Sequence, residues 1–267
     1  MLKHAVEAEE FAVHYQPVMN LQNGSIVGVE ALVRWNHPER GLLAPSEFLE
    51  EAEASGHIIH IDRWVLRQAC RQVREWQRHV SGAETLSVHV NLSARQLQHP
   101  ELAEEIAEAV RVSGLAPNDL ILEITETTLV RDAEAAASEL RKLKDLGVRL
   151  ALDDFGTGFS SLSHLHEFPI DIIKIDRSFV SAIGDGSKRS ELVRALVSLG
   201  ITLGLVVVAE GIEDRAQLEY LRSIGCELGQ GYYFAKPLEA DRLEMLLPQA
   251  SLREPVLALA AVSSRVG

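Results

Sequence analysis

The sequence lacks the long apolar runs and the cysteine pairs that mark membrane-spanning and disulfide-stabilised proteins. Its aliphatic stretches at 206–209 and 256–262 are far shorter than the roughly 18 residues that a membrane span requires. Cys70 and Cys226 are the only cysteines among 267 residues, too few for a disulfide framework. The acidic first ten residues contain no apolar signal-peptide core. We therefore expect a cytoplasmic globular protein whose chain makes no membrane contact.

The sequence is also poor in positive charge and in aromatic residues. It has 26 basic and 39 acidic residues, a net charge of −13, and an aromatic content of 5%. No stripe of lysine or arginine is present, so the electrostatic pattern of a protein that binds a nucleic-acid polymer is missing. A phosphate-containing substrate would therefore need a few well-placed basic residues or bound metal ions.

What the sequence does contain is a repeated alternation of short aliphatic runs and longer amphipathic segments. The runs are typical of buried parallel strands and predict them at 86–90, 120–124, 148–152, 172–175 and 205–209. Two of the helical segments between them are expected to end at glycines, 191–199 at Gly200 and 215–224 at Gly225. Repeated βα units of this kind predict a single barrel. A doubly wound sheet is the alternative, although the glycine-rich dinucleotide turn that it often carries is missing.

The start of the chain has a different pattern. Residues 11–18 and 25–35 are predicted strands, and the Asn-Gly pair in the turn 22–24 between them is a strong hairpin signal. The predicted fold is therefore α/β, a (β/α)8 TIM-type barrel with an antiparallel first strand. We divide the chain into a helical lead-in at 1–10, the barrel at 11–247 and a C-terminal tail at 248–267.

Polar residues stand at the carboxyl ends of nearly all the predicted strands. They are Glu30, Asn91, Glu123, Asp153, Asp154, Lys174, Glu210 and Gln230. In barrels of this type, residues at these strand ends line the active site. Carboxylate and amide oxygens suit Mg²⁺ or Mn²⁺ rather than zinc, and the adjacent pair Asp153 and Asp154 would let one carboxylate bridge two ions. Two such ions generate hydroxide at neutral pH and stabilise an in-line phosphoryl displacement.

A structural interpretation competes with this one, because buried acidic residues also occur in ion-pair networks. It explains any single residue of the set well. It explains the whole set poorly, since that much negative charge cannot be buried without cations. Lys174 and Arg34 would supply the fixed positive charge that the chain as a whole lacks.

These residues lie in motifs that resemble the EAL domain family of bacterial cyclic-di-GMP phosphodiesterases. The family signature matches Glu30-Ala31-Leu32, which is followed by Val33-Arg34-Trp35. The further matches span about residues 8–247 and are Tyr15-Gln16-Pro17, Asn91-Leu92-Ser93, Glu123-Ile124-Thr125-Glu126, the loop at 153–158, Lys174-Ile175-Asp176, Glu210-Gly211-Ile212-Glu213 and Gly229-Gln230-Gly231-Tyr232. The tripeptide alone would be a weak signal, whereas so many motifs in one order are specific.

The resemblance implies a two-ion site. Glu30, Asn91, Glu123 and Asp153 would hold one Mg²⁺ or Mn²⁺, and Asp153 together with Asp154 would hold the second. Ca²⁺ is expected to inhibit, because it favours a different coordination geometry.

The resemblance also implies roles for residues around the ions. Lys174 would contact or polarise the attacking water and is a candidate general base, and Glu210 and Gln230 would assist through water. Glu126 would steady the loop at 153–161, which in this family couples metal binding to dimerisation. The implied substrate contacts are Gln16, the Leu32 backbone, Arg34, Asp176 and Pro237.

The reaction implied by the resemblance is hydrolysis of one phosphodiester bond of cyclic-di-GMP to linear 5′-pGpG. We expect a homodimer, and fusion to GGDEF or sensory domains in a longer protein. One alternative is a catalytically silent receptor that binds cyclic-di-GMP and signals through a partner. Such relatives usually lack several acidic ligands or the lysine, all of which this sequence retains. The other alternative is a barrel hydrolase that acts on a different phosphate ester.

Overall fold

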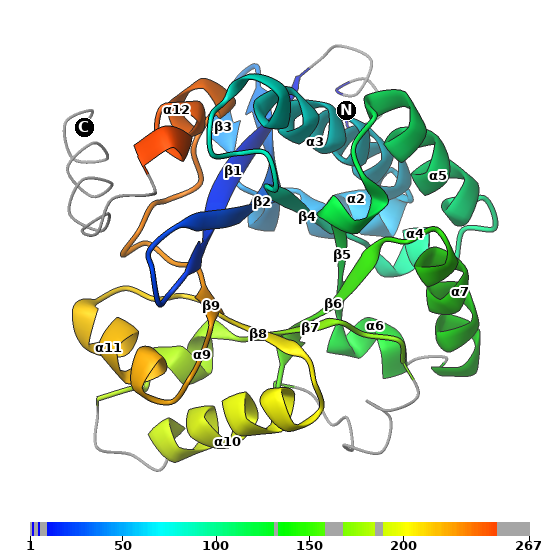
Figure 1. Ribbon diagram of the computed structural model, residues 1–267. Coiled ribbons are helices and arrows are strands. Elements are labelled where there is room, and N and C mark those ends of the chain that lie inside the picture. The colour runs from blue at the N-terminus through cyan, green and yellow to red at the C-terminus, as the bar shows by residue number, and fades with distance from the viewer. Residues whose placement is uncertain are drawn as a thin grey trace.

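The computed structural model describes residues 2, 5, 10–130, 133–157, 168–184 and 189–249. Its centre is a nine-stranded sheet in the order β1-β9-β8-β7-β6-β5-β4-β2-β3, which closes because β1 also pairs with β2. The strands are β1 Phe11–Asn20, β2 Ile26–His37, β3 Gly41–Leu43, β4 Ser87–Asn91, β5 Leu120–Thr125, β6 Arg149–Phe155, β7 Ile172–Ile175, β8 Val206–Ala209 and β9 Leu228–Gly229. Eight strands form the closed barrel, and β3 is an antiparallel extension of β2 (Figure 1).

The predicted antiparallel first strand is confirmed. β1 runs antiparallel to both of its neighbours, β2 and β9, whereas β2 runs parallel to β4 and the ring continues in parallel to β9. The reversal occurs at the turn after Asn20, whose side-chain oxygen accepts the backbone N–H groups of Gln22 and Asn23 at 2.9 and 3.1 Å. Gly24 completes the turn with a φ of 74°, a conformation that glycine adopts without steric cost.

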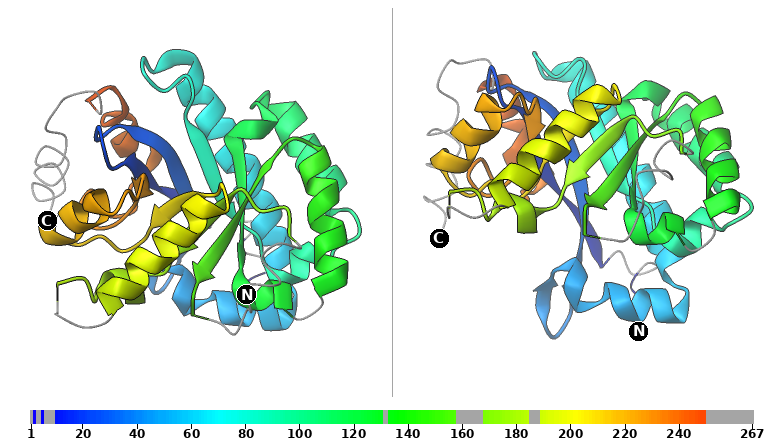
Figure 2. Two further views of the ribbon diagram at one scale, coloured as in Figure 1. Left: turned by 60° about the horizontal axis from the view of Figure 1, so that its bottom comes forward. Right: turned by 90° about the horizontal axis from the view of Figure 1, so that it is seen from below.

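Helices cover the outside of the barrel, as the views along and across its axis show (Figures 1 and 2). The helices are α2 Leu49–Ser55, α3 Ile58–His79, α4 Ala94–Leu97, α5 Leu102–Ser113, α6 Glu126–Val130, α7 Ala133–Asp145, α9 Arg177–Val180, α10 Arg189–Thr202, α11 Arg215–Ser223 and α12 Ala240–Glu244, with short 3-10 turns at Pro45–Glu47, Pro117–Asp119 and Leu247–Gln249. Within these described ranges, no helix is both long and apolar enough to cross a membrane. Cys70 and Cys226 are buried as free thiols.

The predicted end of one helix at Gly200 is wrong. α10 continues through Gly200 to Thr202, and the chain turns at Gly204, which has a φ of 71°. Gly200 instead packs closely against the sheet from inside α10. A Cβ at this position would lie 2.4 Å from Val207 and 2.8 Å from Ile173. By contrast, α11 ends at Ser223, just before Gly225, as predicted.

The barrel interior is built in layers that follow from the two-residue period of the strands. The apolar residues Val18, Ile121, Ala151, Ile172 and Val208 form a small buried cluster of their own. Side chains two residues further along a strand lie on the same face, so the layer above this cluster is set by the sequence. That layer contains Glu123, Asp153 and Lys174 on the parallel strands β5 to β7, and Glu210 directly after β8. The apolar cluster is therefore the floor of a polar site.

The barrel boundaries at 11–247 remain a prediction, as do the lead-in and the tail. Of the first ten residues the structure describes Leu2, Ala5 and Glu10, and the first two are helical and buried. Beyond Gln249 the tail lies outside the described residues.

Candidate active site

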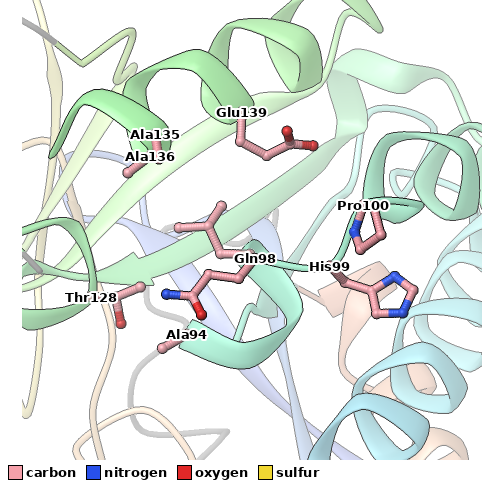
Figure 3. A pocket seen from close by; sticks show the side chains of 9 residues that line it. Ala94, Gln98, His99, Pro100, Thr128, Ala135, Ala136 and Glu139 are labelled. Atoms are coloured by element: carbon pink, nitrogen blue, oxygen red, sulfur yellow. The ribbon is translucent and has the colours of Figure 1, made fainter. Parts of the chain in front are cut away.

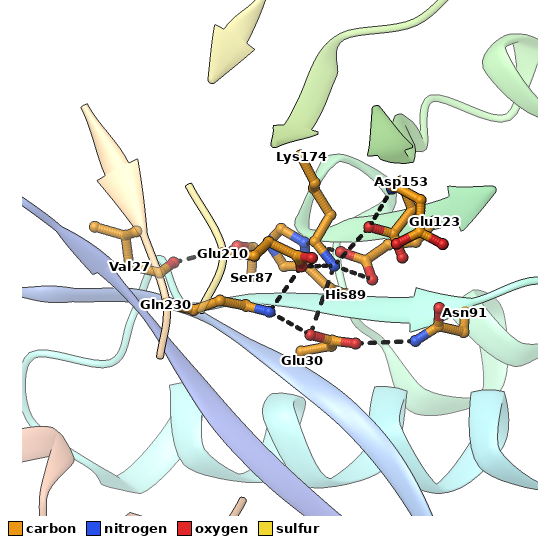
Figure 4. A network of polar contacts seen from close by, with 11 residues as sticks. Val27, Glu30, Ser87, His89, Asn91, Glu123, Asp153, Lys174, Glu210 and Gln230 are labelled. Atoms are coloured by element: carbon orange, nitrogen blue, oxygen red, sulfur yellow. Dashed lines mark hydrogen bonds and ion pairs between the residues drawn. The ribbon is translucent and has the colours of Figure 1, made fainter. Parts of the chain in front are cut away.

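The centre of the polar layer is the ammonium group of Lys174. The Lys174 side chain is only 1% exposed, and its Nζ lies 2.7 Å from Glu210 and 2.8 Å from Glu123. Asp153 and Glu30 follow at 3.4 and 3.5 Å. Figure 4 shows the lysine reaching into this group of four carboxylates. The structure therefore brings together residues from β2, β5, β6 and β7 and from the end of β8.

Glu30 is held by amide groups on both sides (Figure 4). The Asn91 amide donates to one of its oxygens at 3.0 Å, and the Gln230 amide donates to the other at 2.6 Å. Gln230 also donates to Glu210 at 3.0 Å, while its own amide oxygen is buried without a hydrogen-bond partner. A buried oxygen without a donor is suited to accept from a water or to face a cation.

His89 belongs to the site although the sequence analysis did not single it out. Its Nδ1 makes a hydrogen bond of 2.8 Å with Oε1 of Glu123, and the imidazole is 2% exposed. Burial and the positive charge of Lys174 lower the pKa of His89 to about 3, so the ring is neutral. The available signal was a histidine two residues before Asn91 in an otherwise aliphatic strand, on the same strand face.

Asp153 and Asp154 both reach the cleft because the strand is irregular there. In a regular strand, adjacent side chains point to opposite faces. The β6–β7 register shifts between Leu152 and Phe155, and Asp154 has a φ of 55°. That left-handed conformation is uncommon for a residue other than glycine and typically costs about 1–3 kcal/mol. Asp153, Asp154 and Glu210 consequently offer ligand oxygens within 4.8 Å of one another.

The site contains more carboxylates than positively charged groups. Burial raises the pKa of Glu123 well above its usual value and that of Glu210 to about 8, against the opposing charge of Lys174. Burial also acts to raise the pKa of Glu30, but Lys174 and the two amide hydrogen bonds lower it overall. The pKa of Lys174 is raised by the surrounding carboxylates, Asp153 first, although burial itself opposes that shift. Four carboxylates therefore share one ammonium. A bound cation would offset the excess negative charge of this buried group.

The donor set fits a hard divalent cation. Its oxygen ligands are carboxylates at close range, and no cysteine or zinc-type cluster stands among the described residues at the mouth. The competing structural interpretation is correct in part, since Lys174 pairs with each carboxylate. The structural interpretation does not account for Asp154. Its left-handed backbone turns a second carboxylate toward the cleft, and an ion-pair network around Lys174 does not require that carboxylate.

Glu126 contacts the start of the loop that follows the aspartate pair. It begins α6 directly after β5, is buried, and accepts the backbone N–H of Gly156 at 3.2 Å. Gly156 has a φ of 97°, and its position faces the Phe179 ring. Residues 158–161 of this loop lie outside the described residues.

A cleft of about 290 Å³ opens beside the carboxylates, and several of the expected substrate contacts line it. Gln16, Leu32 and Asp176 are on its wall together with Asp153, Asp154, Glu210 and Gln230. Gln16 is fixed by donating to the Ala235 carbonyl at 3.0 Å. Arg34 donates to the Val33 carbonyl at 2.8 Å, and Pro237 precedes Leu238, which pairs with Tyr15. Arg34 and Pro237 do not line this cleft as the structure describes it.

A neighbouring hollow of about 460 Å³ shares Glu30 and Leu32 with this cleft. It extends along α3, where Asp62 lies on its wall with one carboxylate oxygen that is buried and has no partner. Burial raises the pKa of Asp62 to about 7, against hydrogen bonds from Ser93. Asp62 is a second residue that the sequence analysis did not single out.

A third pocket, of about 240 Å³, lies between α4 and α7 and shares Ala94 and Thr128 with the hollow along α3 (Figure 3). Its walls include Ala94, Gln98 and Ala136, and the acidic Glu139 on its rim pairs with Lys142 at 2.7 Å. Glu139 and His99 are the titratable residues in its lining, which does not contain a group of carboxylates like the one around Lys174.

Several known proteins are similar to this chain in sequence and in fold. The EAL domain family matches residues 1–237. The chain is 43% identical over 242 residues to the bifunctional diguanylate cyclase/cyclic di-GMP phosphodiesterase MucR of Pseudomonas aeruginosa, covering 91% of this chain and 35% of that protein. It is also 43% identical over 246 residues to the cyclic di-GMP phosphodiesterase NbdA of the same organism, covering 92% and 31%. The chain thus spans about a third of the length of these curated relatives.

The chain is also similar in fold to a solved structure. The PaMucR phosphodiesterase in complex with c-di-GMP superposes with a TM-score of 0.86 at 43% sequence identity. The match covers 91% of this chain and 97% of that chain. The similarity therefore extends over most of the chain.

Proposed function

The chain belongs to the EAL domain family, and from that premise we propose that it is a metal-dependent phosphodiesterase that hydrolyses cyclic-di-GMP to linear 5′-pGpG. The observation that carries the proposal is the group of four carboxylates around Lys174 at the mouth of the barrel. The relatives named as cyclic di-GMP phosphodiesterases support the same activity.

The residues proposed to hold two Mg²⁺ or Mn²⁺ ions are Glu30, Asn91, Glu123, Asp153 and Asp154. Such ions, when bound, would activate water and stabilise the charge that develops at the phosphate during in-line displacement. The chain itself would orient the carboxylate ligands before an ion binds. Two amide groups orient Glu30, and the neutral His89 orients Glu123.

Lys174 is proposed to act on the attacking water through its charge. Its Nζ stands among the carboxylates, so an incoming water that replaces one of these contacts would receive a hydrogen bond from the ammonium. An ammonium donates and cannot accept a proton, so the general-base role would require Lys174 to lose its proton first. Glu210 and Gln230, which are hydrogen-bonded to each other, are proposed to hold the same water from the other side.

The substrate is proposed to lie in the cleft against Gln16, the Leu32 backbone and Asp176, which line it. Arg34 and Pro237 do not line this cleft and are proposed as further contacts on the family resemblance alone. Water oxygen would bond to phosphorus as the bond from phosphorus to the 3′ oxygen breaks. The water gives up a proton and the leaving 3′ oxygen gains one. The ring is thereby opened at one phosphodiester, which leaves a 5′ phosphate on the linear dinucleotide.

The test is to incubate the protein with cyclic-di-GMP and Mn²⁺ or Mg²⁺ and to separate the nucleotides by chromatography. We expect pGpG to accumulate, and EDTA to stop its formation. Binding without pGpG would instead identify a silent receptor. Neither binding nor turnover would point to a different phosphate ester. Homodimer formation, a cytoplasmic location and fusion to GGDEF or sensory domains are proposals that rest on the family resemblance.

A further inference from the structure

An exposed aromatic ring stands at the rim of the mouth cleft. Tyr232 is 58% exposed and lines the cleft together with Gln230 and Asp176. The other large apolar side chains left open in the described part of the chain are aliphatic: Leu42, Val112, Leu192, Ile201 and Met245. None of these five described side chains lines the cleft. The open aromatic ring is therefore found at the site itself.

The backbone that carries Tyr232 is held on both sides. Gly231 packs so tightly on Ile212 that a Cβ there would lie 2.1 Å from the Ile212 carbonyl oxygen. The Tyr233 amide donates to that same oxygen at 2.9 Å. The next ring, Phe234, is buried and meets Tyr233 edge-on with centroids 5.5 Å apart. The backbone around Tyr232 is therefore held in place, so a ligand that covers the ring has to order only the side chain.

A positive group flanks the ring. The Lys236 ammonium lies over it, 5.6 Å from the ring centroid. An aromatic ring with a cation beside it, on the wall of a cleft lined by carboxylates, can bind a nucleotide. The base can stack on the ring face away from Lys236, and the ammonium can face a phosphate.

We propose that Tyr232 is the stacking surface for one purine base of the bound cyclic dinucleotide. The inference rests on the proposed function, because it concerns the substrate of the same cleft. Stacking uses the face of a base and leaves its hydrogen-bonding edge free. Tyr232 accordingly contributes to affinity, whereas other groups would have to recognise which base is bound.

The test compares three substitutions at one position. Tyr232→Phe keeps the ring, Tyr232→Leu keeps apolar volume without a ring, and Tyr232→Ala removes both. The Kd for cyclic-di-GMP is measured by calorimetry in Ca²⁺ buffer, where the proposal expects ligand to bind without turnover. Met245→Ala is the matched control, since Met245 is also 58% exposed but lies outside the cleft.

We expect Tyr232→Ala and Tyr232→Leu to raise Kd by about 5- to 150-fold, the range for loss of one base–aromatic stack. Tyr232→Phe and Met245→Ala should stay within about 2-fold of the parent chain, because neither removes a stacked ring. A leucine variant that binds as tightly as the parent, a phenylalanine variant as weak as alanine, or an alanine variant with unchanged Kd would each overturn the proposal.

A parallel turnover assay in Mn²⁺ separates this proposal from the proposed function. If the parent chain binds cyclic-di-GMP but releases no pGpG, the phosphodiesterase activity fails and the Kd series still decides the role of Tyr232. If the parent chain makes pGpG and the alanine variant binds equally well, only the stacking role fails. Absence of binding by the parent chain would overturn both.

Discussion

The ammonium nitrogen of Lys174 lies 2.7 Å from a carboxylate oxygen of Glu210, and three further carboxylates surround the same nitrogen. This contact joins Lys174 on β7 to Glu210, which directly follows the neighbouring strand β8. Removing either partner would leave buried charge unpaired, which is more costly than the pair itself is stabilising. The same group of residues thus determines both the stability of the barrel mouth and its chemistry.

Substitution of the central charges should abolish turnover. We expect Lys174→Ala and Glu30→Ala each to lower kcat for cyclic-di-GMP by at least about 100-fold, because each removes a group fixed against the reacting water or its metal ligands. Lys174→Ala should also lower the free energy of unfolding in EDTA by roughly 3–5 kcal/mol, since it leaves carboxylates unpaired. Chromatography of the products and urea unfolding measure the two effects.

Lys144→Ala is the matched control for this pair of effects. Lys144 makes an ion pair with Asp171 at 2.7 Å, but both side chains are about one-third exposed and lie away from the mouth. An exposed pair contributes at most about 1 kcal/mol. Near-parental turnover in Lys174→Ala, or an equal loss in Lys144→Ala, would contradict the assigned role.

Calcium should inhibit the enzyme in competition with manganese. Ca²⁺ accepts the same oxygen ligands but takes more of them at longer distances, so it would fill the site without matching the geometry of the smaller ion. Initial rates measured at fixed Mn²⁺ and rising Ca²⁺ should fall toward zero and recover when Mn²⁺ is added. Full activity in excess Ca²⁺ would count against the two-ion mechanism.

Glu126 should act by positioning the loop after Asp153 and Asp154. Its carboxylate accepts the Gly156 amide, so Glu126→Ala frees the loop that begins directly after the two proposed ligands. We expect the Mn²⁺ concentration for half-maximal rate to rise by about 10-fold or more, as for other groups that orient metal ligands. The Glu126→Gln variant keeps an acceptor and should recover most of the affinity. Equal effects of the two substitutions on Mn²⁺ dependence would argue against positioning through this hydrogen bond.

Asp62 should make stability depend on pH. Burial raises the pKa of its carboxyl from 3.8 to about 7 in the folded chain. Between these values the folded chain binds a proton that the unfolded chain has released, so the stability contributed by Asp62 falls as pH rises from about 4 to about 7. Asp62→Asn removes this dependence while keeping an acceptor for Ser93.

The measurement for Asp62 is urea unfolding of the parent chain and Asp62→Asn at pH 4.5 and pH 8. The two proteins should be similar at the lower pH. The variant should be more stable by about 1–4 kcal/mol at the higher pH, because burial raises the pKa of this carboxyl from 3.8 to about 7. Parallel stability profiles would show that the carboxyl is not protonated in the folded chain.

Much of the fold could be predicted because its signals are local. Aliphatic runs define the parallel strands, and the Asn23-Gly24 turn defines the antiparallel hairpin. The two-residue strand period then places Glu123, Asp153 and Lys174 on the inner face without any knowledge of tertiary structure. This explains why a set of strand-end residues scattered over 200 positions could be assembled into one site.

The features that could not be predicted depend on contacts between distant segments. A glycine after an amphipathic segment predicts a helix end at Gly200. The residue instead lies inside α10, where the absence of a side chain allows close packing against Val207 and Ile173. The left-handed backbone of Asp154 follows from an irregular register with β7. His89 belongs to the site because the fold brings its ring on β4 against Glu123 on β5.

The most direct test of the account is an anomalous difference map from crystals of the protein soaked in Mn²⁺. We expect two peaks at the barrel mouth, the first among Glu30, Asn91, Glu123 and Asp153, and the second against Asp153 and Asp154. A map with no peak at the mouth under saturating Mn²⁺ would contradict the proposal that this site holds the ions that cleave cyclic-di-GMP.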